Sequence, residues 1–134
     1  MKPYEILVVG GSEYHLKFTT ANAVNLEEEL KTDLLSGLGK VAELKTLAKY
    51  YFAAAKSLND SISTIDDIYQ LFDDYFNGGG NFEELQILII DVLISSGIMT
   101  KENGDHMKSI YESKKKLTVD QMEKIAEVLQ KLSD

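Results

Sequence analysis

One stretch of the chain carries oxygen-bearing side chains at a spacing that could bind a metal ion. On the twelve-residue Ca²⁺-loop pattern, Asp73 falls at the first position, Asn77 at the fifth and Glu84 at the twelfth. Two positions do not fit, because Tyr75 stands third, where an oxygen ligand belongs, and Gly80 stands eighth, where a β-branched residue is usual. The pattern therefore favours an ordinary helix–turn–helix loop with acidic flanks. A calcium-responsive, EF-hand-like helical switch is kept as an alternative.

The remaining reactive residues form no catalytic set. His15 and His106 lie in unrelated segments, and neither has a partner at metal-ligand spacing. Sequence neighbours such as Asp66 and Asp67 point about 100° apart on a helix, so their carboxylates do not converge. With no cysteine there is no thiolate ligand or thiol nucleophile. We therefore expect a protein that is not an enzyme and binds neither a metal nor a cofactor.

Composition narrows the class of partner. The 134 residues carry a formal net charge of -8 and include no arginine, which argues against nucleic acid as a partner. The N-terminal residues lack the apolar core of a signal peptide. The longest apolar run is about half the length of a membrane span and contains Asp91. We expect a cytoplasmic protein that does not bind a membrane.

The N-terminal pattern predicts a β-hairpin. Two runs of strand-forming residues, 4–9 and 13–18, flank Gly10-Gly11, and two glycines supply the positive φ that a tight hairpin turn needs. Tyr14, Leu16 and Phe18 alternate with polar residues, as in a half-buried strand.

Four helices are expected after the hairpin. They run from a cap at Thr20 to the glycines at 37 and 39, from 41 to 58, from a capping box at Ser63 or Thr64 to Asn77, and from Phe82 to Ser96. The predicted inner face of the second comprises Leu44, Leu47, Ala48, Tyr51, Phe52, Ala55 and Leu58.

The fourth predicted helix is apolar almost all the way round. From Ile87 to Ile94 every residue except Asp91 is apolar, whereas a surface helix shows one apolar stripe and one polar face. This helix must therefore be enclosed, either by its own domain or by a partner.

The pattern predicts an α+β fold, with an N-terminal β-hairpin followed by a mostly helical bundle of about four helices and a C-terminal amphipathic helix. Residues 1–98 would form the core domain, residues 99–117 a polar linker or loosely packed arm, and residues 118–134 the last helix. The apolar stripe of that helix includes Met122, Ile125 and Leu129, and it would dock on the domain or bind a partner.

Aromatic and acidic residues alternate along the third helix and the turn after it. Aromatic side chains rimmed by acids suit a protein–protein contact, since aromatics anchor interfaces and rim charges steer the partner. The aromatics could equally be ordinary core residues. The candidate partner-binding residues of this segment are Tyr69, Asp73, Asp74 and Tyr75.

The order and spacing of several segments between residues 4 and 98 resemble the tail assembly chaperones of tailed phages and prophages of low-GC Gram-positive bacteria. The shared features are the strand–turn–strand, an N-x-x-x-L-E helix from Asn22 to Glu27, the closing Ser96-Gly97, and a D-x-Y-x-L-x-D-D-Y segment made of Asp67, Tyr69, Leu71, Asp73, Asp74 and Tyr75.

The resemblance implies a non-structural morphogenesis protein that acts through protein–protein contacts. Such a protein would bind the long, helical tape-measure protein, recruit tail-tube subunits around it, and leave before the virion is complete. It could form homo-oligomers. A structural, oligomeric virion subunit is the further alternative.

Overall fold

A tight hairpin opens the fold, as the glycine pair predicts. The structure is a computed structural model and describes residues 4–115 and 127–132. Strands β1 (Glu5–Val9) and β2 (Ser12–Leu16) pair antiparallel, with Val9 opposite Ser12 beside the turn. Gly10 and Gly11 adopt φ values of 57° and 82°, a backbone region that favours glycine. The alternation of apolar residues turns Leu7, Val9 and Leu16 toward the helices.

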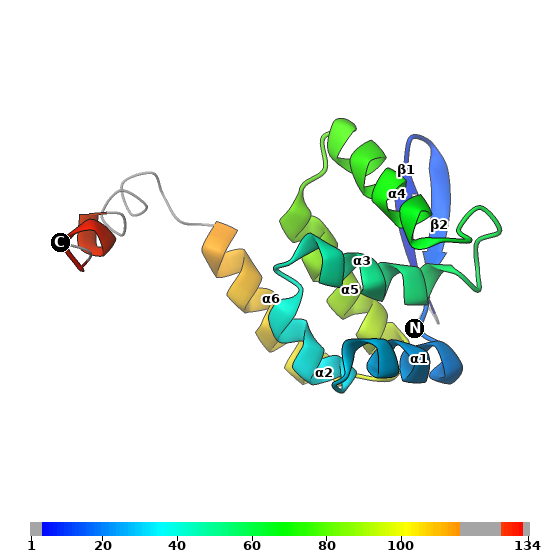
Figure 1. Ribbon diagram of the computed structural model, residues 1–134, viewed down its shortest axis with the longest axis horizontal. Coiled ribbons are helices and arrows are strands. Elements are labelled where there is room, and N and C mark those ends of the chain that lie inside the picture. The colour runs from blue at the N-terminus through cyan, green and yellow to red at the C-terminus, as the bar shows by residue number, and fades with distance from the viewer. Residues whose placement is uncertain (1–3, 116–126, 133–134) are drawn as a thin grey trace.

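The helices form a bundle on one side of the hairpin, with α3 crossing the middle of the molecule (Figure 1). The structure is 65% helical, which exceeds the expected half and confirms the α+β class. The elements are α1 (Thr20–Leu30), α2 (Leu34–Gly37), the 3₁₀ turn η1 (Leu38–Lys40), α3 (Leu44–Ala55), α4 (Ile65–Asn77), α5 (Phe82–Ser95) and α6 (Lys101–Lys115). Residues 127–132 form a further short helical segment.

The predicted first helix is two helices, and its cap is one residue earlier than expected. Thr19, not Thr20, caps α1. The chain breaks at Lys31, which takes a left-handed φ of 60° while its N–H bonds the carbonyl oxygen of Glu27 at 2.8 Å. Asp33 then caps α2 by accepting the N–H of Ser36 at 3.0 Å. The caps at Lys31 and Asp33 divide the helix. The apolar spacing continues through Leu30 and Leu34, so it does not reveal this break.

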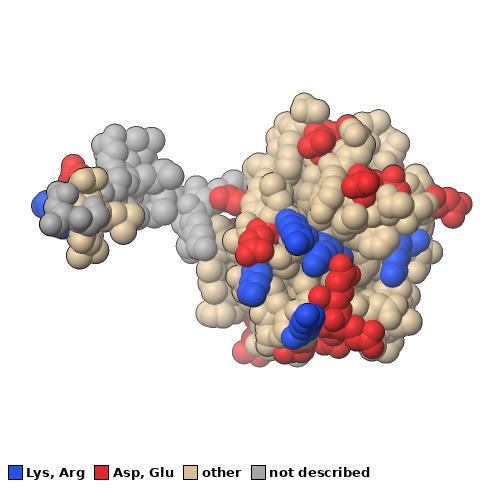
Figure 2. Space-filling model, viewed as in Figure 1, with Lys and Arg blue, Asp and Glu red and all other residues tan. Residues whose placement is uncertain are grey.

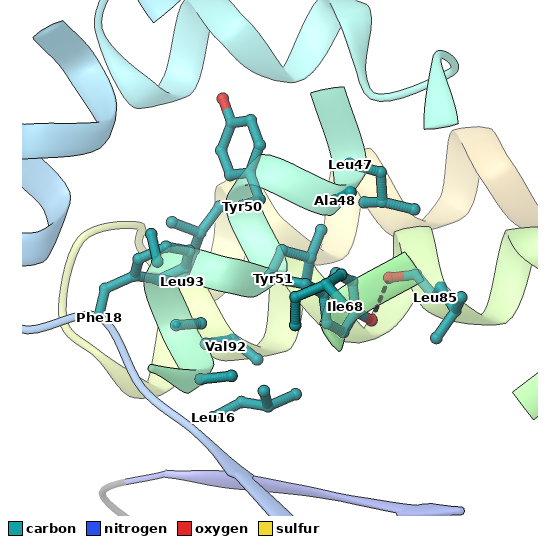
Figure 3. Close-up of a cluster of buried hydrophobic side chains, with 14 of the residues drawn as sticks. Leu16, Phe18, Leu47, Ala48, Tyr50, Tyr51, Ile68, Leu85, Val92 and Leu93 are labelled. Atoms are coloured by element: carbon teal, nitrogen blue, oxygen red, sulfur yellow. Dashed lines mark hydrogen bonds between the residues drawn. The ribbon is translucent and has the colours of Figure 1, made fainter. Parts of the chain in front are cut away.

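Helix α5 is enclosed by its own chain. Of the two alternatives that its apolar composition left open, its own domain or a partner, the structure shows the first. Its side chains Leu85, Ile89, Ile90, Val92 and Leu93 have no exposed area. Helix α5 contacts β1, α3 and α6. Figure 3 shows Val92 and Leu93 among core side chains from other elements. Burial of this many apolar side chains, at about 25 cal/mol per Å², is the main stabilisation of the domain.

The buried face of α3 is wider than the predicted stripe and is shifted. Leu47, Ala48, Tyr51 and Ala55 are fully buried as expected, but Leu44 and Leu58 are 54% and 46% exposed. Their prediction as inner residues was wrong, because α3 begins only at Leu44 and ends before Leu58. Tyr50, which the stripe omits, is fully buried. Helix α3 has neighbours on several sides, namely α1, α4, α5 and β2, so more than one stripe is covered.

Within the polar segment 99–117, the described residues up to 115 are mostly helical and do not form a linker or loosely packed arm. Most of it forms α6, which begins after Thr100, whose hydroxyl accepts the N–H of Asn103 at 3.2 Å. Helix α6 packs along α5 through Gly104, which leaves room for Ile94 and Ile90. The linker prediction was wrong because the face of α6 that contacts α5 includes a glycine and a lysine. These residues interrupt the apolar periodicity by which an amphipathic helix is recognised in a sequence. The contact face is Gly104, Met107, Lys108 and Tyr111.

An ion pair completes the α5–α6 contact. Lys108 Nζ donates a 2.8 Å hydrogen bond to Asp91, the single charged residue within the apolar run of α5. This hydrogen bond raises the pKa of Lys108, so the ammonium stays charged. Asp91 therefore has a structural partner that the sequence did not reveal.

Of the two capping boxes proposed for α4, the one at Thr64 forms. The carboxylate of Asp67 accepts the N–H groups of Thr64 and Ser63 at 2.9 and 2.8 Å. These hydrogen bonds, with the backbone of Ser63 contributing most, lower the pKa of Asp67 from its ordinary value of 3.8.

We expect Asp67→Ala to lower the melting temperature at pH 7 and to have progressively less effect in acid. A carboxyl with a lowered folded pKa stabilises the fold above its unfolded pKa, and this stabilisation is lost as the pH falls through the folded value. Melting curves of both proteins from neutral pH to below 3.8 test this. Asp66→Ala, in the same turn, is the control. A melting-temperature difference that stays constant with pH would contradict the prediction.

Candidate partner-binding surface

The exposed face of α4 combines an aromatic ring with carboxylates. The opposite face buries Ile68, Leu71 and Phe72. This leaves Asp66, Tyr69 and Asp73 exposed, and they lie on one side because residues three, four and seven apart share a helix face. Tyr69 is 42% exposed, a large fraction for an aromatic side chain.

Three of the four predicted partner-binding residues of this helix lie on that face or beside it. Asp74 is exposed next to Asp73, and its carboxylate accepts a 2.9 Å hydrogen bond from Gln70. Asp66, Asp73 and Asp74 have no ion pair in the described part of the chain. We call Asp66, Tyr69, Asp73 and Asp74 the acidic face.

The fourth residue, Tyr75, has a different position. Its ring covers Gly80, where a Cβ would collide with it, and burial raises the pKa of its hydroxyl. Tyr75 is only partly exposed, so it packs the turn between α4 and α5 as much as it contributes to the surface.

The loop that resembled a calcium site is organised by helix caps. Glu84 accepts the N–H of Asn81 at 3.0 Å, while the side chain of Asn81 accepts the N–H of Glu84 at 2.9 Å. The carboxylate expected at the last ligand position thus closes a capping box for α5. Within residues 4–115 and 127–132, no three acidic or histidine side chains are grouped to hold a metal ion.

The candidate residues near the C-terminus are only partly covered. Met122 and Ile125 lie outside the described residues. Leu129 is 60% exposed, and its neighbours Val128 and Leu132 are 56% and 78% exposed. The apolar side chains that the structure describes here are therefore available for contact.

The structure also contains a groove lined by lysines, which the sequence analysis did not predict. It has a volume of about 520 Å³ and lies between the end of α1, the α2–η1 segment and the first half of α3. Figure 2 shows lysines gathered over these elements. No sequence pattern marks it, because its lysines come from separate elements that the fold brings together. We call it the lysine groove; its basic lining residues are Lys31, Lys40, Lys45 and Lys49.

Together, these features describe an exposed acidic face on α4 and a lysine-lined groove between the end of α1, the α2–η1 segment and α3. No protein-family model, curated protein or solved structure matches the chain. Among the described residues, no helix combines the length and apolar character that crossing a membrane requires.

Proposed function

We propose that this protein is a phage tail assembly chaperone, which binds the tape-measure protein and recruits tail-tube subunits through protein–protein contacts. The observation that supports this most directly is the acidic face of α4, where an exposed tyrosine lies among carboxylates that have no ion-pair partner among the residues that the structure describes. The order of the segments from 4 to 98, which resembles the chaperone family, supports the choice of client.

The chemistry of the acidic face suits a helical client that carries lysine or arginine beside an apolar stripe. The ring of Tyr69 offers a large, rigid contact area, and tyrosine is enriched among residues that dominate binding energy. Asp66 and Asp73 flank it at helical spacing. Carboxylates at such a rim attract a basic partner and set its register. The buried face of α4 packs on the domain and fixes the helix in place, so the acidic face is already formed before a client binds.

The test measures binding of the purified chain to a tape-measure protein, the proposed client. We expect Tyr69→Ala to weaken binding by on the order of tenfold, since an interface tyrosine contributes about 1–2 kcal/mol or more. We expect Asp73→Lys/Asp74→Lys to weaken it further, because the reversed charges repel a basic client. Calorimetry at two salt concentrations gives both the affinity and its electrostatic part.

The matched control is Glu102→Lys/Glu112→Lys, which changes the net charge by the same amount on exposed positions of α6. It should bind the client as the wild type does. Equal loss in the control and the α4 variant would contradict a specific role for the acidic face. Presence of the chain in purified virions would favour the structural-subunit alternative instead.

A further inference from the structure

The lining of the lysine groove holds more lysines than carboxylates, so its own chain compensates only part of its positive charge. Four lysines and two glutamates line it: Glu29 lies 3.8 Å from Lys49, and Glu43 accepts a 3.3 Å hydrogen bond from the hydroxyl of Thr46. Lys31, Lys40 and Lys45 are exposed and have no ion pair in the described part of the chain. A groove of this composition in a chain of net charge -8 fits an acidic occupant.

The same side of the molecule also presents acidic side chains over α4 (Figure 2). Figure 2 shows red carboxylates over α4 and blue lysines over the α1–α2–α3 corner in a single view. Asp66, Asp73 and Asp74 are exposed and likewise without ion pairs among the described residues. Carboxylates over α4 and lysines over the α1–α2–α3 corner, with other carboxylates among those lysines, are therefore visible from the same side of the molecule (Figure 2).

We propose that a second copy of this chain is the occupant of the lysine groove. Two copies related by a two-fold axis would place the acidic face of each against the lysine groove of the other. A two-fold interface is self-complementary: a patch on one copy meets a second patch on its partner, and the same two patches meet again with the copies exchanged. Two patches of opposite sign on one face satisfy that condition, and both contacts form in one closed dimer.

At ordinary ionic strength, the attraction between the acidic face and the lysine groove in contact outweighs the repulsion between the net negative charges of the two chains. Charges more than about 8 Å apart are screened near 0.15 M salt, whereas contacting pairs are screened less.

The inference goes beyond the proposed function. Because the dimer covers the acidic face assigned to the client, self-association and client binding would compete for α4.

The first measurement is the molar mass of the wild-type chain by sedimentation equilibrium up to about 1 mM, where weak association is detectable. We expect a monomer–dimer equilibrium that weakens by on the order of tenfold between about 0.05 M and about 0.5 M salt. A chain that stays monomeric throughout, or that forms species larger than a dimer, would overturn the proposal.

The second measurement uses matched charge reversals. Lys40→Glu/Lys45→Glu reverses the groove and Asp73→Lys/Asp74→Lys reverses the acidic face, while Lys31 is left unchanged because its backbone is left-handed. Each variant alone should be monomeric, since its patches now have the same sign. An equimolar mixture should form a heterodimer, because both contacts then join opposite charges again.

The control Glu102→Lys/Glu112→Lys should dimerise as the wild type does, and circular dichroism should show the same helix content for all variants. A mixture that stays monomeric overturns the two-fold arrangement. Client binding of the groove variant separates the two proposals, because its acidic face is intact: loss of dimer with retained client binding leaves the proposed function standing.

Discussion

Leu93→Ala is expected to lower the free energy of unfolding by about 2–5 kcal/mol, the range for truncating a fully buried leucine. Leu93 has no exposed area and lies on the helix that the rest of the domain encloses. The loss includes the transfer free energy of the removed methyl groups and the cost of the cavity left behind. Small domains have only about 5–15 kcal/mol of stability in total, so this change removes a large share of it.

Urea denaturation at neutral pH measures the effect, and Ile110→Ala provides the comparison. Ile110 is 47% exposed on α6, and its truncation should cost less than about 1 kcal/mol. Similar small losses for both variants would mean that α5 is not enclosed by its own chain and is completed by a partner. That result would contradict the packing described above.

Gly37→Ala is expected to destabilise the domain by about 1–3 kcal/mol, although alanine favours helix formation and Gly37 is helical. A Cβ at this position would collide with the hydroxyl oxygen of Tyr50 and lie 3.2 Å from a methyl carbon of Leu30. The hydroxyl cannot move freely, because it donates a 2.6 Å hydrogen bond to the carbonyl oxygen of Leu34. Burial raises the pKa of Tyr50, so the hydroxyl remains a neutral donor.

A double-mutant cycle with Tyr50→Phe identifies the collision as the cause. Tyr50→Phe alone should cost about 1–3 kcal/mol, because the carbonyl oxygen of Leu34 loses its donor. In the double variant the added methyl group meets no hydroxyl, so the combined loss should be smaller than the sum of the two. Additive losses in urea denaturation would show that the hydroxyl is not what excludes a side chain at Gly37.

Much of the fold can be predicted because its signals are local. The glycine pair after β1 demands a tight turn, and Thr64 with Asp67 forms the predicted capping box. The acidic face of α4 was also predictable in part. With Ile68 and Phe72 turned inward, Tyr69 and Asp73 must lie on the other side of the helix, since a helix repeats every 3.6 residues.

Errors arose where burial depends on neighbours that are distant in the sequence. Tyr50 is buried because Phe18, between β2 and α1, and Leu34 on α2 approach it: the ring centroids of Tyr50 and Phe18 lie 6.4 Å apart. Helix α6 docks through Gly104 and Lys108, whose fit depends on Ile94 and Asp91 across the contact. No periodicity within α3 or α6 contains this information.

The sequence by itself determined the elements, the need to enclose α5 and the acidic character of α4, because turn chemistry, capping and helical periodicity act over a few residues. Only the tertiary structure decided what encloses α5 and how the lysine groove is assembled. The lysines of the groove come from α1's end, η1 and α3, and their convergence depends on how those elements pack. Packing is set by complementary shapes across long sequence separations, which a linear pattern does not record.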